Sequence, residues 1–228
     1  MTKLSDQLLQ RAAIHAALGE PARLAIIDEL SFSDRSPRDL GSRLQIPSNL
    51  LAHHLDTLEN IGLILRSTSS GDARRRYIRL APSSLHLIAP RRSSPRKPLF
   101  FLCTQNSARS QLAAAIWQTQ TGQPAKSAGT QPASQIHRQA ISAAKRHKIE
   151  LNDIAPTAIG KIPRNVQVVT VCDLVHEELR APFDWWHWSI PDPVPSGNAK
   201  AFDAVIAELK GRVNQVINST VTEKGMKS

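Results

Sequence analysis

The sequence predicts two domains of different class: a mostly helical domain with a β-hairpin, then an α/β domain with a doubly wound, four-stranded parallel sheet. Three observations support this. Apolar residues recur at helical spacing from residue 4 to residue 58. A stretch rich in Pro, Ser and basic residues follows. Beyond it, continuous apolar runs typical of buried parallel strands alternate with helical patterns. We therefore expect a first domain at 1–81, a linker at 82–97, a second domain at 98–220 and a flexible tail at 221–228.

The first domain is expected to contain four helices and a hairpin. Leu4, Leu8 and Leu9 belong to the apolar face of a first helix over 4–18. Pro21 and Pro37 suit the first turns of the second and third helices. Ser48 is a candidate N-cap for a fourth helix that runs to about residue 60. Two strands, at 62–66 and 76–80, flank a polar turn, so the order is that of a winged helix-turn-helix.

In such a fold the fourth helix lies in the major groove of DNA and the hairpin contacts the backbone or the minor groove. The expected DNA-contacting residues are Ser48, Asn49 and His53 on the helix and Arg74, Arg75 and Arg76 on the hairpin. Residues 1–97 hold 15 Lys or Arg against 9 Asp or Glu, a net charge of +6 within the total of +10. Such a basic domain is suited to a polyanion, although the charge alone is equally compatible with a role in solubility.

Residues 46–64, IPSNLLAHHLDTLENIGLI, resemble the ArsR-type repressors, and the similarity extends over about 8–80. The resemblance implies an arsenic-responsive transcription regulator that binds double-stranded operator DNA as a homodimer. Many such repressors sense metalloids through a cysteine pair, but residues 28–45 contain no cysteine. The histidines are too few to indicate a site, so no metal site is predicted.

In the second domain we expect strands at 99–102, 126–128, 166–171 and 188–190, with helices at about 107–120, 137–147 and 199–217. Cys103 ends the first strand, and Arg109 and Ser110 open the helix that follows. In this C-x5-R-S arrangement, backbone N–H groups and the helix N-terminus surround an oxyanion and favour the thiolate. The expected oxyanion loop is Thr104, Gln105, Asn106, Ser107, Ala108, Arg109 and Ser110.

Arg109 is expected to bind two oxyanion oxygens in a planar, bidentate contact, and Ser110 to donate a hydrogen bond to the sulfur. Asp192, between Pro191 and Pro193, is the expected general acid, unless it is only part of an Asp-Pro turn. Cys172, after the third strand, is either a second reactive thiol or a buried structural one.

Residues 98–218 resemble the low-molecular-weight tyrosine phosphatase superfamily, and within it the arsenate reductases, on three further segments: 127–130, 169–173 and 187–193. The resemblance implies that Cys103 attacks arsenate, Asp192 protonates the departing hydroxide, and Cys172 or an external thiol releases arsenite. Position 179 is leucine where some reductases keep a third cysteine, so a small thiol or glutaredoxin-like reductant is expected. The alternatives are a phosphomonoesterase acting on phosphotyrosine or a small ester, and a regulator whose second domain only senses an oxyanion.

The remaining features concern location and cofactors. No apolar run approaches the ~18 residues that span a bilayer, and the first residues lack the apolar segment of a signal peptide. Two cysteines cannot form a disulfide framework and suit a reducing compartment. We expect a cytoplasmic protein with no bound cofactor and no membrane partner.

Overall fold

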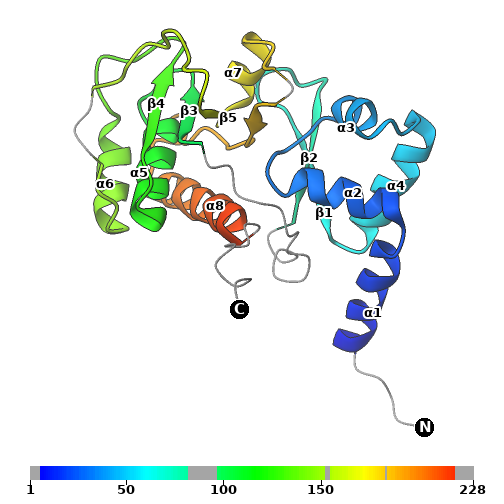
Figure 1. Cartoon of the computed structure of the whole chain (residues 1–228). Helices are drawn as coiled ribbons and strands as arrows, with labels where there is room; N and C mark the ends of the chain where they lie inside the picture. The colour runs from blue at the N-terminus through cyan, green and yellow to red at the C-terminus, as the bar shows by residue number, and fades with distance from the viewer. Residues whose placement is uncertain (1–5, 82–96, 152–154, 183, 219–228) are drawn as a thin grey trace, which may run out of the picture. The chain divides into compact units, whose positions relative to one another are not determined.

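The computed structural model describes residues 6–81, 97–151, 155–182 and 184–218 (Figure 1). They form two compact units, Met1–Thr68 with Arg74–Pro90 and Ser69–Ala73 with Arg91–Ser228. The five residues Ser69–Ala73, between β1 and β2, thus belong to the second unit. Nearly all of the expected linker and the whole expected tail lie outside the described residues.

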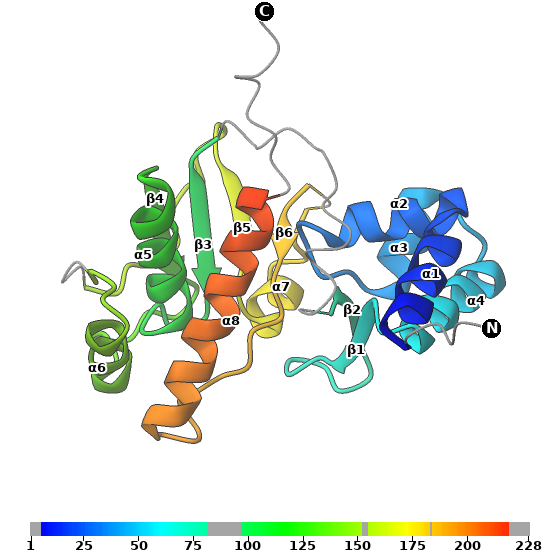
Figure 2. The ribbon, with the colours of Figure 1, turned by 90° about the horizontal axis from the view of Figure 1, so that it is seen from below.

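The first unit consists of four helices followed by an antiparallel hairpin. The elements are α1 (Asp6–Leu18), α2 (Pro21–Leu30), α3 (Pro37–Leu44), α4 (Ser48–Asn60), β1 (Ile64–Thr68) and β2 (Arg76–Leu80). Ile27, Leu40 and Leu58 are fully buried in the core that the helices share, and Ile78 of the hairpin joins them. The four helices gather around this core (Figure 2). The N-terminal region is therefore mainly helical, as predicted.

Three details of the first unit differ from the sequence prediction. The first strand of the hairpin, expected at 62–66, is β1 at Ile64–Thr68, two residues later. Leu8 and Leu9 are about half exposed, whereas Ile14 is buried, because α1 joins the core only through its C-terminal half. Ser48 does not cap α4. The N-cap is Pro47, which makes no side-chain hydrogen bond, and Ser48 is the first helical residue.

The second unit contains a four-stranded parallel sheet, as predicted, and its strand order is β4–β3–β5–β6. The strands are β3 (Leu99–Cys103), β4 (Ala125–Gly129), β5 (Gln167–Thr170) and β6 (Trp186–His187). The helices are α5 (Arg109–Thr121), α6 (Arg138–Arg146), α7 (Asp173–Glu178) and α8 (Ala199–Asn218). Helix α5 packs against β3, β4 and α8, and α8 packs also against α6. Strands β3 and β5 lie side by side at the centre (Figure 2).

The last strand and α7 depart from the prediction. The fourth strand was expected at 188–190 but lies two residues earlier. Trp188 N–H still donates to the Thr170 carbonyl, but Ile190 N–H then donates to the Trp188 carbonyl, so the chain turns before Pro191. Helix α7 has only six residues, too few to show the periodic spacing of apolar residues that predicts a helix, so the sequence did not predict it.

The parallel strands place their carboxyl ends at one edge of the sheet. Strand β3 ends at Cys103, Cys172 follows β5 after one residue, and β6 ends at His187. Ligands of open α/β sheets bind at this edge, so these ends mark the region of the candidate site.

Within the described part of the chain, no helix is long and apolar enough to cross a membrane.

Candidate active site

The Cys103 sulfur lies at the centre of a tight loop between β3 and α5. Asn106 N–H donates a hydrogen bond to Sγ at 3.2 Å, and Ser110 Oγ lies 2.9 Å from Sγ. The N-cap of α5 is Ala108, which makes no side-chain capping hydrogen bond. An N-terminus without such a cap presents N–H groups and positive potential to an anion. The loop can therefore stabilise negative charge on the sulfur and on a bound oxyanion.

The backbone orientation of this loop is fixed by the segment that follows β4. The carbonyls of Thr104, Gln105 and Ser107 accept from the N–H groups of Gln131, Ala133 and His137, each at 2.9 Å. Because the carbonyls are bound on this side, the peptide planes are held in one orientation before any ligand arrives.

Asn106 braces the loop from within. Its backbone is left-handed, with φ of 49°, a conformation that Asn tolerates better than most residues. The buried amide donates to Ser110 Oγ at 2.8 Å and Ser127 Oγ at 2.9 Å, and its oxygen accepts from Gln111 Nε2 and from Thr157 N–H. Since all four hydrogen-bonding positions of the amide are used, Asn106 is fixed where the loop needs it.

Gly129, at the end of β4, is a loop-supporting position that sequence reasoning did not assign. A Cβ atom there would lie 2.4 Å from the Thr104 carbonyl oxygen and 2.9 Å from Asn106 N. Both atoms are backbone, so the loop itself would have to move. Only the close approach of two backbone segments, which a sequence does not display, makes glycine necessary here.

We expect Gly129→Ala to lower the free energy of unfolding by about 1–3 kcal/mol, because it overpacks a closed site. Turnover should fall more than stability alone explains, because the displaced atoms belong to the loop around Cys103. Urea unfolding and steady-state assays measure the two effects. The control is Gly160→Ala, where a Cβ meets nothing within 4 Å. Equal behaviour of the two variants would contradict this account.

Arg109 lies beside the loop and is held by the segment after β6. Its Nη1 donates to the Ile190 carbonyl at 3.2 Å, and its Nη2 lies 3.1 Å from Asp192 Oδ2. The arginine is mostly buried, whereas the Asp192 side chain is 42% exposed. Asp192 also lines the same cavity as Cys103, so its carboxyl group is a candidate donor of a proton to a leaving oxygen.

Cys172 also lies beside this loop. Its sulfur is 3.6 Å from Thr104 Oγ1, and its side chain is buried. Burial raises the pKa of the Cys172 thiol, and the nearby Arg109 guanidinium opposes this only in part. Cys172 is therefore held as a thiol in the resting protein, beside the residues that surround Cys103.

A buried pair, Asp173 and His187, was not found from the sequence. His187 Nε2 is 3.1 Å from Asp173 Oδ1, and its Nδ1 is 2.9 Å from Thr170 Oγ1. Burial by itself raises the pKa of Asp173, but hydrogen bonds from His187 and from the Ser70 amide outweigh it and lower the pKa to about 2. The sequence feature that could have identified this pair is its position, because both residues lie near the carboxyl ends of neighbouring strands.

A cavity of about 400 Å³ lies beside the loop that follows Cys103. Its lining includes Cys103, Arg109, Cys172 and Asp192, the four residues predicted as catalytic, together with Ser70. No aromatic side chain is among the described residues that line it. The cavity thus brings together the Cys103 thiol, the Arg109 guanidinium, the Asp192 carboxyl group and the Cys172 thiol.

Comparison with known proteins assigns this domain. The model of the low molecular weight phosphotyrosine protein phosphatase family matches residues 98–227, more than half of the chain. The chain belongs to this family. A search of the curated proteins found no match.

Solved structures similar to the phosphatase-family domain carry different activities in their names. Tyrosine phosphatase amsI from Erwinia amylovora is 17% identical, with a TM-score of 0.49, over 55% of this chain and 94% of that one. Arsenate reductase from Archaeoglobus fulgidus is 23% identical, with a TM-score of 0.44, over 52% and 98%. YwlE arginine phosphatase from Geobacillus stearothermophilus is 24% identical, with a TM-score of 0.46, over 53% and 90%. At these values the likenesses do not decide between activities.

The residues expected to contact DNA lie in the first unit, outside the family match. All six are exposed: Ser48, Asn49, His53, Arg74, Arg75 and Arg76. Ser48 and Arg76 line one groove of about 680 Å³, together with Arg38 and Arg66.

Across the residues that the structure describes, no group of three or more His, Cys, Asp or Glu side chains is placed to hold a metal ion.

Proposed function

We propose that the phosphatase-family domain is an arsenate reductase. The observation that carries this proposal is the second thiol, because Cys172 lines the same cavity as Cys103 and lies beside Thr104 of the oxyanion loop. A phosphatase needs one cysteine, whereas reduction of arsenate to arsenite needs two electrons, which two thiols supply when they form a disulfide.

In the proposed reaction, Cys103 Sγ attacks the arsenic atom while Arg109 and the loop amides hold the oxygens. Asp192, at the opening, protonates the oxygen that departs as water. Cys172 Sγ then attacks Cys103 Sγ, the sulfur–arsenic bond breaks, and its electron pair leaves with arsenic as arsenite. An external thiol, from a small molecule or a glutaredoxin-like protein, reduces the resulting disulfide. Because Cys172 is buried as a thiol, the attack requires loss of its proton during this step.

Two further readings of the site compete with this proposal. Cys103, Arg109 and Asp192 suffice for hydrolysis of a phosphate monoester, which is the activity in the family description. The same loop can also serve as an oxyanion sensor without turnover. The lining without aromatic side chains favours a small oxyanion over an aryl ester, because stacking on an aromatic side chain stabilises a bound ring.

The deciding assay uses purified protein with arsenate, glutathione and glutaredoxin, or with dithiothreitol, beside p-nitrophenyl phosphate. We expect arsenite to form with at least one thiol system and to depend on Cys172, since Cys172→Ser removes the second thiol. Hydrolysis of p-nitrophenyl phosphate that exceeds arsenate reduction and survives Cys172→Ser would assign a phosphatase. Tight arsenate binding without product would assign a sensor.

We further propose that the first unit is a winged helix-turn-helix that binds operator DNA as a homodimer, which makes the chain an arsenic-responsive regulator fused to its enzyme. Four helices precede the hairpin, and exposed Ser48, Asn49 and His53 lie in the first half of α4. The groove that Ser48 and Arg76 share with Arg38 and Arg66 also includes Asp56, which pairs with Arg66. Its three arginines and one carboxylate leave a net positive charge, which suits a phosphate backbone.

Arg74→Ala combined with Arg75→Ala should weaken binding to all double-stranded DNA alike and reduce the salt slope of log K by about 2, because each arginine is expected to neutralise one phosphate. Fluorescence anisotropy at several salt concentrations measures both. Lys126→Ala with Lys161→Ala removes the same charge from exposed positions of the second unit and serves as the control. A loss confined to one operator sequence would instead make the two arginines base-reading residues.

A further inference from the structure

The cavity around Cys103 includes one residue from far outside the phosphatase-family match. Ser70 lines it together with Cys103, Arg109, Cys172 and Asp192. Ser70 belongs to the short loop Ser69–Ala73, which is part of the second unit. The family match begins at residue 98, so this loop is an addition to the family's own site.

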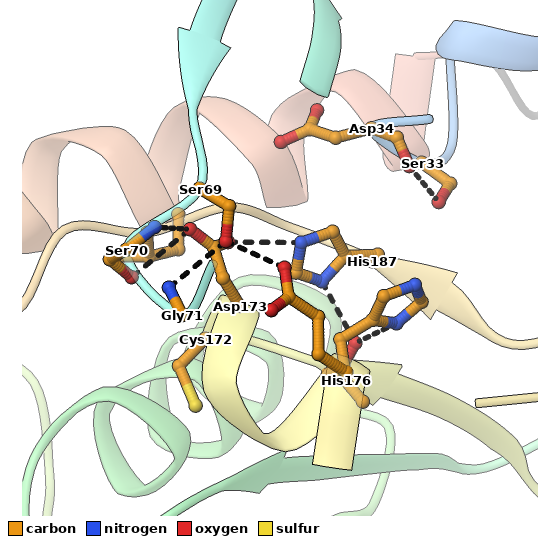
Figure 3. Close-up of polar contacts among 12 residues, drawn as sticks. Ser33, Asp34, Ser69, Ser70, Gly71, Cys172, Asp173, His176 and His187 are labelled. Carbon is orange, nitrogen blue, oxygen red and sulfur yellow. Dashed lines mark hydrogen bonds and ion pairs between the residues drawn. The ribbon is translucent and has the colours of Figure 1, made fainter. Parts of the chain in front are cut away.

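Hydrogen bonds fix this loop on the first turns of α7 (Figure 3). The Ser70 N–H and Oγ donate to Asp173 Oδ2 at 2.7 and 3.0 Å, and Ser69 Oγ donates to Glu177 Oε1 at 2.6 Å. Ser69 Oγ also accepts from the N–H groups of Gly71 and Asp72, which closes the loop into a turn. Ser69 is buried by these contacts.

Gly71 permits the loop to approach α7 closely. A Cβ atom at this position would lie 2.7 Å from Glu177 Oε2 and 3.2 Å from the Cα of Leu174. The glutamate can swing aside, but the helix backbone cannot. A side chain larger than hydrogen at position 71 would therefore push the loop away from α7 and from the cavity.

The anchor of the loop is also part of the site's frame. Asp173 directly follows Cys172, and its other carboxylate oxygen contacts His187 at 3.1 Å. His187 begins the segment that leads to Asp192. One carboxylate thus connects the loop to the second thiol and to the segment that carries the acid, as Figure 3 shows for Asp173, Cys172 and His187.

We propose that the loop Ser69–Ala73 forms part of the wall of the Cys103 cavity, and that Ser70 makes the cavity selective for small oxyanions over aryl phosphate esters. The selectivity rests on the proposed oxyanion chemistry at Cys103. A fixed polar loop occupies one side of the opening, and neither Ser70 nor the described residues Leu174, Val194 and Pro195 of the lining offer an aromatic surface to a ring.

Cross-linking tests the position of the loop without any assay of activity. In full-length protein with Cys103→Ser, the thiol introduced by Ser70→Cys and that of Cys172 are the only two. A short bismaleimide should join them about tenfold faster than it joins Cys172 to the thiol of Ser142→Cys, because thiols lining one cavity have a high effective concentration. Ser142 is an exposed residue of α6 outside this cavity. Equal cross-linking rates would overturn the proposed wall.

Ligand protection tests the selectivity. Inorganic phosphate and phenyl phosphate are titrated against alkylation of Cys103 by iodoacetate, in the wild type, in Gly71→Val and in Gly160→Val. We expect Gly71→Val to bind phenyl phosphate about tenfold better relative to phosphate, since the displaced loop opens the cavity. Gly160, where a Cβ meets nothing, is the matched control and should keep the wild-type ratio.

The two experiments separate the possible failures. An unchanged ratio in Gly71→Val, with the loop cross-linked as expected in the wild type, would overturn the role of Ser70 in selectivity. If neither phosphate protects Cys103 in the wild type, oxyanion binding at this cysteine fails, and with it both the proposed function and the selectivity. The cross-link still decides where the loop lies.

Discussion

Cys103→Ser is expected to abolish both arsenate reduction and phosphate ester hydrolysis, to below ~1% of the wild type, because the covalent step carries more than a hundredfold of the rate. Oxyanion binding should remain, since the proposed donors are the loop amides and Arg109 and not the sulfur. Arsenite release, p-nitrophenol release and calorimetric phosphate binding measure the three quantities.

The control for this substitution is Ser142→Ala, a small change at an exposed position of α6, which should leave all three quantities at wild-type values. Residual turnover of Cys103→Ser well above ~1% would remove Cys103 from the nucleophile role. Loss of phosphate binding together with turnover would show that the sulfur, and not the loop, holds the oxyanion.

Arg109→Lys is expected to lower kcat/KM by about 10²–10³, although the charge is kept. The guanidinium uses two nitrogens, Nη1 toward the Ile190 carbonyl and Nη2 toward Asp192, and its fork matches two oxyanion oxygens. A lysine ammonium ends in one nitrogen and cannot hold the Asp192 segment and an oxyanion in the same geometry.

Arg146→Lys is the matched control. Arg146 also donates from two nitrogens, Nε and Nη2, to a carboxylate, that of Asp203. Unlike Arg109, it lies exposed on α6. We expect its substitution to change kcat/KM less than twofold, in line with the small effect of surface ion pairs. Similar losses in both variants would mean that the effect at Arg109 is not specific to the site.

Features encoded in short stretches of sequence were predictable. The strand before Cys103, the spacing to Arg109 and the helix after it all lie within about two dozen consecutive residues, so one motif revealed them together. The parallel sheet followed from the alternation of apolar strands and helices. The order of its strands and the registers between them appear only in the structure.

Features that depend on distant segments were not predictable. Gly129 is necessary because of the Thr104 carbonyl 25 positions earlier, and Ser70 lies near Cys103 through a hydrogen bond to Asp173. The prediction that the whole apolar face of α1 packs inward was wrong for a related reason. Its apolar spacing is helical, but how far a neighbouring helix covers it is a tertiary property, and Leu8 and Leu9 remain exposed.

A single-turnover experiment tests most directly whether Cys103 and Cys172 together reduce arsenate. Pre-reduced protein, freed of small thiols, is mixed with arsenate; arsenite is quantified and the peptides are analysed by mass spectrometry. We expect one arsenite per chain and a disulfide between the peptides of Cys103 and Cys172, because the two thiols supply both electrons. No arsenite, or arsenite formed while Cys172 stays a free thiol, would contradict the claim.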